Sequence, residues 1–364
     1  MEFKVNKGVL EKTLNAIVKL IPPKSTYTVL QNIIIEAKGK NLSIEGTDLD
    51  VFVKKVIPAD IKEEGKVLLP GKKIQEITRE TNVEEITFKL KDLNLLIIAG
   101  NARFHIPALD YQEFPEVPKF PEKKWFELTA GEMEDMIETT IFMVSKDLSR
   151  RPMNGVLIHV KDNALRFVST DGARLALHKK ELKSPVGELI VGTKVFDLID
   201  FDRPEEKITV YLEERMVGIK FLDTTVIGRL IEGPYPNYDG ALPKTFTGKC
   251  YVEKETLDGA LKRMAIVAPP QIKSVKFEFQ DKGIVLSAAS PDSGEAKEEI
   301  PGVHEGEKMG IWFNASYLLE ILRHIKSDDV EFHLTSSTTA ALVQPKDNVD
   351  LLYLLMPLRI DSFE

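Results

Sequence analysis

The segment FKVNKGVLEKTLNAIVKL, residues 3–20, begins as a short strand and continues as an amphipathic helix. The same order of parts returns in FELTAGEMEDMIETTIFMV (126–144) and in CYVEKETLDGALKRMAIVA (250–268). In all three helices the apolar side chains recur at three-and-four spacing, which places them on one face. These faces consist of Leu10, Leu14, Ile17 and Val18; Met133, Met136, Ile137 and Ile141; and Leu257, Leu261, Met264 and Ala265. The recurrence predicts a chain built from three copies of one unit.

The remaining parts of the unit recur as well. A hairpin follows each first helix, because apolar and β-branched runs flank a short turn; the hairpins lie in residues 32–50, 154–173 and 274–293. A second strand-and-helix passage follows in residues 68–81, 190–206 and 311–329. Each copy then closes on two more strands, in residues 86–109, 208–231 and 330–360. The apolar ending LLYLLMPLRI is thereby predicted to contain the last strand of the third copy.

The spacing between copies is nearly constant. Phe3 and Phe126 stand 123 residues apart, as do Thr47 and Thr170. Proline-rich polar stretches at 113–125 and 234–249 have the composition of linkers. We therefore expect an α+β fold of three tandem domains, 1–121, 122–246 and 247–364, each with two helices and several antiparallel strands.

Composition limits the functional classes. The chain has 49 Lys+Arg against 57 Asp+Glu, a net charge of −8, which argues against a nucleic-acid partner unless a basic surface lies on an acidic body. The single cysteine, Cys250, excludes an internal disulfide and a cysteine metal cage. No segment approaches the ~18 uncharged apolar residues that span a membrane, and no signal peptide opens the chain, so a cytoplasmic location is expected.

Converging reactive groups are not visible in the sequence. No P-loop, GxGxxG or GxSxG motif is present, and no two histidines have metal-ligand spacing on a helix. Asp48 and Asp171 occupy matching turns, TDLD and TDGA, where a carboxylate bonds to backbone amides. A binding function is therefore favoured over catalysis.

Seven motifs carry a resemblance to a known family. They are FKVNKGVLEKTL at the start, GTDLD, EFPEVP, MNGVL with VSTDGARLAL, YPNY with ALP, FNASYLLEIL, and YLLMPLR at the end. Through them essentially the whole chain resembles the bacterial DNA polymerase III beta subunit, the DNA sliding clamp. The resemblance implies a head-to-tail homodimer that closes into a ring of six domains around duplex DNA, with helices inside and sheets outside. It implies a processivity factor that holds the polymerase on its template, with no cofactor, no metal and no catalytic residues.

The resemblance also indicates which basic residues face DNA. Sliding needs only loose, sequence-independent contact with phosphates, so an acidic chain is compatible with this function. Ordinary solvated helix charge is the alternative for any single residue. By position in the resembling segments, the expected DNA-binding residues are Lys24, Lys72, Lys146, Arg150, Arg151 and Lys194.

Two further sites follow from the resemblance. The dimer interface would place Phe104 and Ile106 of one copy against Ile266 and Val267 of the other. A hydrophobic groove between domains 2 and 3 would receive short linear motifs of the DNA polymerase III alpha subunit, the clamp loader, other polymerases and repair proteins. The matching groove positions are Met153, Thr170, Gly172, Arg174, Leu175, Pro236, Asn314, Tyr317, Leu354, Leu355, Met356, Pro357, Leu358 and Arg359.

Some positions depart from the family pattern. Ala173, Gly240 and Ala241 are smaller than the residues usual there, which predicts a wider groove or an altered peptide preference, and Asp361 to Glu364 extend past the usual ending. The alternative hypothesis is a self-associating peptide-binding scaffold that does not act on DNA. A hydrolase with an unrecognised site is the least favoured, because reactive residues do not converge.

Overall fold

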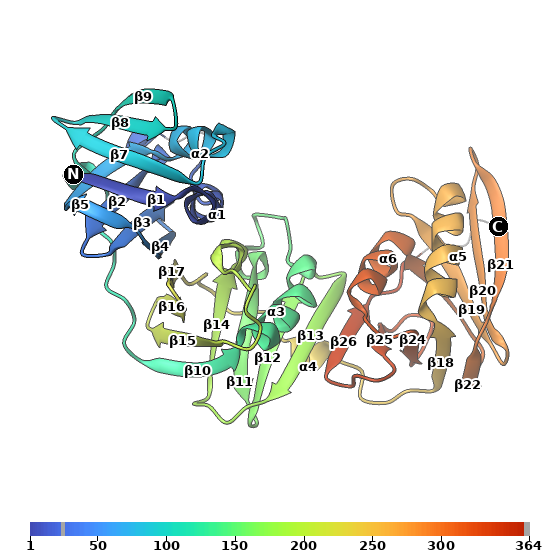
Figure 1. Cartoon of the computed structure of the whole chain (residues 1–364). Coiled ribbons are helices and arrows are strands. Elements are labelled where there is room, and N and C mark those ends of the chain that lie inside the picture. The colour runs from blue at the N-terminus through green and yellow to red at the C-terminus, as the bar shows by residue number, and fades with distance from the viewer. Residues whose placement is uncertain (23–25, 360–364) are drawn as a thin grey trace. The chain divides into compact units, whose positions relative to one another are not determined.

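The computed structural model describes residues 1–22 and 26–359 of the chain (Figure 1). Lys24 and the extension Asp361 to Glu364, both singled out above, lie outside the described residues. The chain divides into two compact units, Met1–Glu134 with Val191–Leu230, and Asp135–Ile190 with Ile231–Glu364. Within the described part, no helix is both long enough and apolar enough to cross a membrane.

The first repeat opens with a capped helix. Asn6 begins α1, because its side-chain oxygen accepts the Val9 N–H, and Leu10, Leu14 and Ile17 are buried on the predicted face. The α-helices of this repeat are α1 (Lys7–Val18) and α2 (Gly71–Glu80), with 3₁₀ turns η1 (Thr28–Gln31) and η2 (Tyr111–Glu113). Its strands are β1 (Glu2–Asn6), β2 (Asn32–Lys38), β3 (Asn41–Thr47), β4 (Val51–Pro58), β5 (Asp60–Glu63), β6 (Gly65–Pro70), β7 (Glu85–Lys91), β8 (Asn94–Ala99) and β9 (Ala102–Pro107).

The second repeat begins its helix with a capping box. Thr129 Oγ1 accepts the Glu132 N–H, and the Glu132 carboxylate accepts the Thr129 N–H in return. The helical segments are α3 (Ala130–Glu138), η3 (Ile141–Met143), η4 (Arg151–Asn154), η5 (Thr193–Leu198) and α4 (Tyr238–Ala241). The strands are β10 (Lys124–Thr129), β11 (Gly155–Lys161), β12 (Ala164–Thr170), β13 (Arg174–Glu181), β14 (Gly187–Gly192), β15 (Lys207–Glu213), β16 (Met216–Phe221) and β17 (Thr224–Arg229).

The third repeat has an aromatic core. Phe277 packs edge-to-face on Phe313, with ring centroids 5.3 Å apart, and close to Phe332. Its helices are α5 (Lys254–Val267) and α6 (Ala315–His324), and its strands are β18 (Gly248–Glu253), β19 (Ser274–Gln280), β20 (Gly283–Ser290), β21 (Gly294–Pro301), β22 (Val303–Gly306), β23 (Met309–Asn314), β24 (Asp329–Leu334), β25 (Ala341–Pro345) and β26 (Leu351–Leu355). The strand predicted in the apolar C-terminal segment is therefore confirmed as β26.

Two expectations about local structure are wrong. The second helix of the second repeat is only the short 3₁₀ segment η5, because Ile199 is extended and the Asp200 carboxylate accepts the Asp202 N–H, a local bond that competes with helix. Each repeat also closes on three strands rather than two. In the first repeat the turn between β7 and β8 puts Asp92 and Leu93 at positive φ, a conformation for which leucine gives no sequence signal.

Sheets run across the boundaries between repeats. Strand β17 of the second repeat pairs antiparallel with β4 of the first; we call this pairing the first junction. Strand β26 of the third repeat pairs in the same way with β13 of the second, the second junction. The sheet orders are β5-β1-β7-β8-β9, β10-β15-β16-β17-β4-β3-β2-β6, β14-β11-β12-β13-β26-β25-β24-β18-β22 and β21-β20-β19-β23. Strands β9 and β21 thus end their sheets.

The two junctions have the same register. At the first junction Val226, the third residue of β17, lies opposite Val53. At the second junction Tyr353, the third residue of β26, lies opposite Ala176. Val53 and Ala176 are themselves equivalent, since each pairs with the sixth residue of the preceding strand, Gly46 or Ser169. The repeat therefore extends to how neighbouring copies join.

Candidate functional site

An apolar cluster lies on one face of the second junction. Leu175 and Leu177 alternate along β13, and Leu354 comes from the neighbouring β26, so their side chains share that face. Tyr238 of α4 completes the centre of the cluster. The other buried members are Leu157, Val168, Ile190 and Ala340, and Ile231, Tyr235, Leu242 and Leu352 pack against them. We call this cluster of buried residues, together with the adjoining C-terminal segment, the partner groove, after the site that the sequence analysis predicts here.

The turn between β12 and β13 borders the partner groove. Gly172 has φ +92°, a backbone conformation that favours glycine. Thr170 Oγ1 accepts the Gly172 N–H at 3.0 Å and donates to the Arg174 carbonyl at 2.6 Å. The Asp171 carboxylate accepts the backbone N–H groups of Ala173 and Arg174. The predicted turn role of this aspartate is confirmed, and the turn is held rigid by its own side chains.

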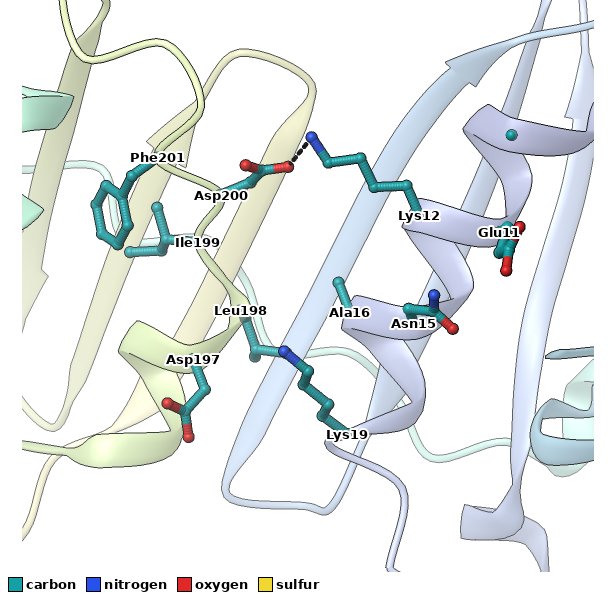
Figure 2. A pocket seen from close by; sticks show the side chains of 11 residues that line it. Glu11, Lys12, Asn15, Ala16, Lys19, Asp197, Leu198, Ile199, Asp200 and Phe201 are labelled. Carbon is teal, nitrogen blue, oxygen red and sulfur yellow. Dashed lines mark ion pairs between the residues drawn. The ribbon is translucent and has the colours of Figure 1, made fainter. Parts of the chain in front are cut away.

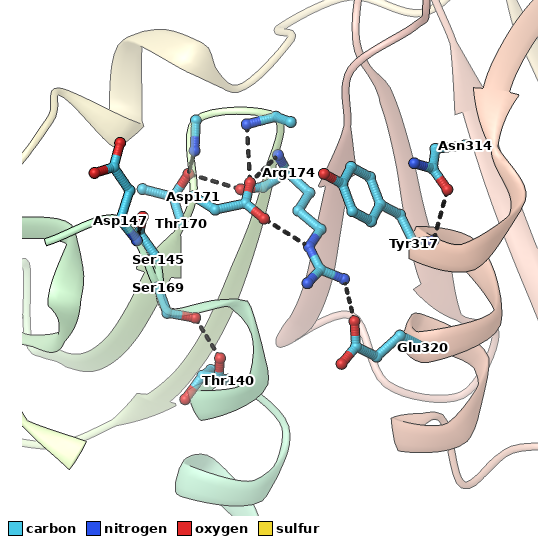
Figure 3. Close-up of polar contacts among 12 residues, drawn as sticks. Thr140, Ser145, Asp147, Ser169, Thr170, Asp171, Arg174, Asn314, Tyr317 and Glu320 are labelled. Carbon is cyan, nitrogen blue, oxygen red and sulfur yellow. Dashed lines mark hydrogen bonds and ion pairs between the residues drawn. The ribbon is translucent and has the colours of Figure 1, made fainter. Parts of the chain in front are cut away.

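Arg174 connects this turn to the third repeat (Figure 3). Its guanidinium donates to Asp171 at 3.0 Å and to Glu320 of α6 at 2.6 Å, and it lies 4.4 Å over the ring of Tyr317. The side chain is only 9% exposed. Asn314 does not contact the guanidinium itself. Its side chain caps α6, which carries Tyr317, by accepting the N–H groups of Ser316 and Tyr317. The guanidinium is thus fixed in place by partners from two repeats.

The C-terminal segment changes character after β26. Leu355 is buried in the core of the third repeat, whereas Met356 is 48% exposed. The Met356 N–H donates to the Ala173 carbonyl at 2.9 Å, and the Leu358 N–H donates to the Trp312 carbonyl at 2.8 Å. Pro357 and Leu358 are half-buried and Arg359 is exposed. Backbone bonds therefore hold this segment beside the groove while its side chains remain accessible.

Some predicted groove residues are placed differently. Met153 and Pro236 are half-buried but are not members of the apolar cluster. Gly240 and Ala241 are exposed in the short α4, and the buried ring of Tyr238 fills the cluster beside them. The sequence analysis missed Leu177 and Tyr238. Alternation along RLALHKKE could have identified the first, but no local pattern marks the second.

Polar groups lock Tyr238 in place. Its hydroxyl lies 2.8 Å from His159 Nδ1 and accepts a hydrogen bond from Arg166. Burial raises the pKa of this phenol and lowers the pKa of His159, so both groups are neutral near pH 7. The neighbouring Asp239 forms ion pairs with Lys161 and with Arg166, the residue that also donates to Tyr238. The tyrosine is consequently held in one position within the apolar cluster.

The basic residues predicted to face DNA fall into two groups. Lys72, Lys146 and Arg151 are exposed and have no ion-pair partner within the part of the chain that the structure describes. Arg150 donates to the Asp171 carbonyl at 3.1 Å, and Lys194 pairs with Asp48 at 2.5 Å. The second group is therefore engaged in holding turns, whereas the first is available to a polyanion.

A pocket of about 480 Å³ lies between α1 and the segment after η5 (Figure 2). Lys12 reaches across it to Asp200, at 2.6 Å, and also pairs with Asp202. These two carboxylates raise the pKa of Lys12 by hydrogen bonding. The positive charge of Lys12 is thus compensated by carboxylates of the first compact unit.

The residues predicted for the dimer interface lie in one edge strand, β9, and at the end of one helix, α5. Phe104 and Ile106 are in β9, and Phe104 lines a largely apolar pocket of about 580 Å³ with Ile77 and Val83. At the end of α5, Ile266 is 76% exposed. The sequence analysis missed Ile77 and Val83.

These features define a class: a chain of three α+β repeats that share sheets, with β9 and β21 among the strands at the sheet edges. The chain belongs to the DNA polymerase III beta subunit family, whose N-terminal, central and C-terminal domain models match residues 1–118, 127–237 and 240–359. It is accordingly a sliding clamp, a non-catalytic processivity factor of bacterial DNA polymerase III.

Individual relatives agree with this assignment. A "Beta sliding clamp" of Pseudomonas putida is 30% identical over 371 residues, which cover 99% of this chain and 100% of the relative. The crystal structure of a Pseudomonas aeruginosa sliding clamp bound to griselimycin has a TM-score of 0.95 at 28% identity, covering 99% of this chain and 100% of that one. The Thermotoga maritima DNA polymerase III beta subunit gives 0.92 at 30% identity, with the same coverage.

Proposed function

We propose that two copies of this chain, each with domains 1–121, 122–246 and 247–364, close head-to-tail into a ring that encircles duplex DNA without reading its sequence. The partner groove then receives short linear motifs of the DNA polymerase III alpha subunit, the clamp loader, other polymerases and repair proteins. The ring keeps these proteins on the template while bonds are made and broken elsewhere.

The single observation that supports ring closure is the repeated junction. At both junctions the last strand of one repeat pairs with the fourth strand of the repeat before it. The corresponding strands of the two outer repeats, β9 in the first and β21 in the third, lie at sheet edges and have one side without a neighbour among the described residues. An unpaired edge presents open N–H and C=O groups to another strand. A second copy supplies the matching edge, and head-to-tail contacts of this kind generate rings.

The internal register predicts the intermolecular one. Phe104 is the third residue of β9, as Val226 and Tyr353 are of β17 and β26. Ala296 lies opposite the sixth residue of β20, as Val53 and Ala176 do in their hairpins. Phe104 of one copy should therefore face Ala296 of the second copy, beside the exposed Ile266.

Cross-linking tests this register. Directly opposed antiparallel residues have Cα atoms ~4.5–5.5 Å apart, a distance that a disulfide spans. Phe104→Cys with Ala296→Cys should oxidise to a covalent dimer, whereas His105→Cys with Ala296→Cys, whose side chains point to opposite faces, should not. Cys250 is buried and its thiol pKa is raised to about 12, so it does not interfere. A monomer of 41.0 kDa in solution would contradict ring closure.

Retention on DNA tests the topological link. After loading, the wild-type clamp should stay on closed circular DNA and dissociate when the circle is cut. Equal retention on both forms would instead indicate electrostatic binding, and no retention on either would favour the scaffold that does not act on DNA. Lys72, Lys146 and Arg151 are the described residues we propose as phosphate contacts, so replacing all three with Ala should reduce the slope of log affinity against log salt by ~0.9 for each phosphate that the variant leaves unneutralised.

The exposed part of the C-terminal segment tests the partner groove. Met356→Ala with Leu358→Ala should weaken binding of polymerase and clamp-loader peptides, because both side chains are accessible where the segment borders the groove. The dimer should persist, since neither residue lies in β9 or β21. Loss of the dimer in this variant would show that the C-terminal segment has a purely structural role.

A further inference from the structure

The first junction has a counterpart of the partner groove. The shared register makes Phe52 equivalent to Leu175, Lys54 to Leu177, and Ile227 to Leu354. Ile34 of β2 corresponds in the same way to Leu157 of β11, because both are third residues of their strands and pair with equivalent residues of the next strand. Four positions that form the floor of the partner groove thus recur in the first compact unit.

These four residues line a pocket of about 490 Å³. Ile34, Phe52 and Ile227 line it from the sheet, and the proline-rich segment 111–120 lines it from the other side. Phe114 of that segment is buried against Ile34, whereas Val117 is 41% exposed at the pocket. We call this site the linker pocket. It is open, apolar at its base and walled by aromatic and proline side chains, as peptide sites usually are.

The charges around the linker pocket differ from those of the partner groove. Lys54 occupies the position of Leu177, and Glu45 occupies the position of Val168. Lys54 and Glu45 form an ion pair at 2.8 Å. Lys66 lies 5.3 Å over the Tyr111 ring and forms an ion pair with Glu36 at 3.6 Å, a separation longer than a hydrogen bond.

A further ammonium group lies next to the lining of the pocket. Lys220 lies 4.4 Å over the ring of Phe120 and opposite Thr225, two residues that line the pocket, and no carboxylate of the described residues pairs with it. Of the carboxylates that line the pocket, Glu45 is already bound by Lys54, which leaves Glu116 as the exposed one. Beside the apolar base there are therefore two ammonium groups, Lys66 with a long ion pair to Glu36 and Lys220 without a carboxylate partner among the described residues, against one exposed carboxylate, Glu116.

We propose that the linker pocket is a second peptide-docking site of this clamp, and that its ligand is a short extended segment with two apolar anchors flanked by acidic residues. The apolar side chains bind the base formed by Ile34, Phe52 and Ile227. The acidic residues pair with Lys66 and Lys220. Because the partner groove has leucine and valine where this pocket has an ion pair, the two sites select different segments, and one chain holds both at once.

A site-specific fluorophore tests the proposal. Val117→Cys labelled with an environment-sensitive dye reports the linker pocket, and Met356→Cys carries the same dye as the matched control at the partner groove. The probe is acetyl-Asp-Phe-Ser-Phe-Asp-amide, and acetyl-Lys-Phe-Ser-Phe-Lys-amide is its charge-reversed control. The acidic probe should saturate the signal at position 117, and it should bind at least fivefold more tightly there than the basic probe.

Two lysine substitutions complete the test. Lys66→Ala with Lys220→Ala leaves the Lys54–Glu45 pair intact and should weaken the acidic probe by roughly tenfold at position 117, because two exposed charge pairs are removed. The response at position 356 should not change. Equal binding of both probes at position 117, or no response there, would overturn the proposal. Either result leaves ring closure and DNA retention unaffected, so failure of this inference is distinguishable from failure of the proposed function.

Discussion

The first and second junctions have one register and two different side-chain environments. Val226 in the first occupies the position that the fully buried Tyr353 occupies in the second. The first junction has an exposed ionic contact from Lys12 nearby, whereas the second has the nearly buried Arg174 between two carboxylates. Backbone pairing alone makes the sheets continuous. The side chains determine how strongly each junction resists opening.

A buried titratable group occupies the same register position in both junctions. Lys55 lies in β4 and His178 in β13, each two residues beyond the equivalent positions Val53 and Ala176. Burial lowers the pKa of both groups. Lys55 has no hydrogen-bond or ion-pair partner among the described residues, whereas His178 Nδ1 lies 2.9 Å from Thr139 Oγ1. The second junction therefore accommodates its polar group better than the first.

The largest expected effect is at Tyr353. Truncation of a fully buried aromatic side chain costs ~3–5 kcal/mol, so Tyr353→Ala should strongly destabilise the second junction. The equivalent Val226→Ala should cost less, at most ~3 kcal/mol, because a smaller side chain is removed. Hydrogen exchange in β13 and β26, compared with β4 and β17, measures the difference.

The hydroxyl of Tyr353 provides the control. It is buried, and no hydrogen-bond partner for it exists in the part of the chain that the structure describes. Tyr353→Phe should therefore leave stability unchanged or raise it by ~1 kcal/mol. A loss comparable to that of Tyr353→Ala would show that the hydroxyl, and not the ring, holds the junction.

Removal of Arg174 should have the next largest effect. Arg174→Ala leaves two carboxylates without their cation, and because Asp171 and Glu320 are partly exposed, we expect a cost of ~2 kcal/mol rather than the full value for a buried pair. Urea unfolding measures it. If Arg174→Met is as stable as the wild type, the ion pairs of Arg174 with Asp171 and Glu320 do not contribute to stability.

Acidification should weaken the second junction selectively. His178 has a folded-state pKa below its ordinary 6.5, chiefly through burial, with Asp135 and Asp350 opposing the shift and Lys180 and Lys326 adding to it. The contribution of neutral His178 to the free energy of unfolding is complete above about pH 6.5. It is lost as the pH falls from there through the lowered folded-state pKa. Urea midpoints should decline over this window in the wild type and stay flatter in His178→Gln. Parallel curves would contradict the assignment.

A gain of stability is expected at the equivalent position of the first junction. Lys55→Met replaces a lysine that is only 6% exposed and lacks a partner among the described residues with an apolar side chain of similar length, and should stabilise the chain by ~1 kcal/mol at pH 7. Urea unfolding at neutral pH measures it. A destabilised variant would indicate that the ammonium has a compensating interaction in solution.

The smallest effect is expected at Lys12. Its side chain is 58% exposed and pairs with Asp200 and Asp202, so Lys12→Ala should cost below ~1 kcal/mol, and the cost should shrink as salt is added. Unfolding at low and high ionic strength measures both. A cost that does not depend on salt would mean that packing of the lysine stem, not charge, is involved.

Periodicity predicted more of the fold than of the site. The apolar faces of α1 and α5 follow directly from three-and-four spacing, and they are buried as expected. Segment η5 could not be predicted in this way, because the Asp200 side-chain bond ends a pattern that otherwise has helical spacing. Sharing of sheets between repeats depends on contacts far apart in sequence, for which no local pattern exists.

The site shows the same limit. Leu175 and Leu354 were identified through the resemblance, whereas Tyr238 enters the groove only because the chain after β17 folds back over β11 and β12. The role of Arg174 as a link to Glu320 likewise appears only in three dimensions. Sequence position alone grouped Arg150 and Lys194 with the other basic residues, but hydrogen bonds to turns distinguish them.

The shared sheets determine where this chain can be cut. The compact units divide the second repeat, so that β15, β16 and β17 go with the first repeat while β11, β12 and β13 go with the third. A fragment truncated at the proline-rich linkers would lack the strand across each junction and expose β4, β13, β17 or β26 as a new edge, a template for aggregation. The compact units instead follow the sheets, so the covalent repeats and the compact units are out of phase in this molecule.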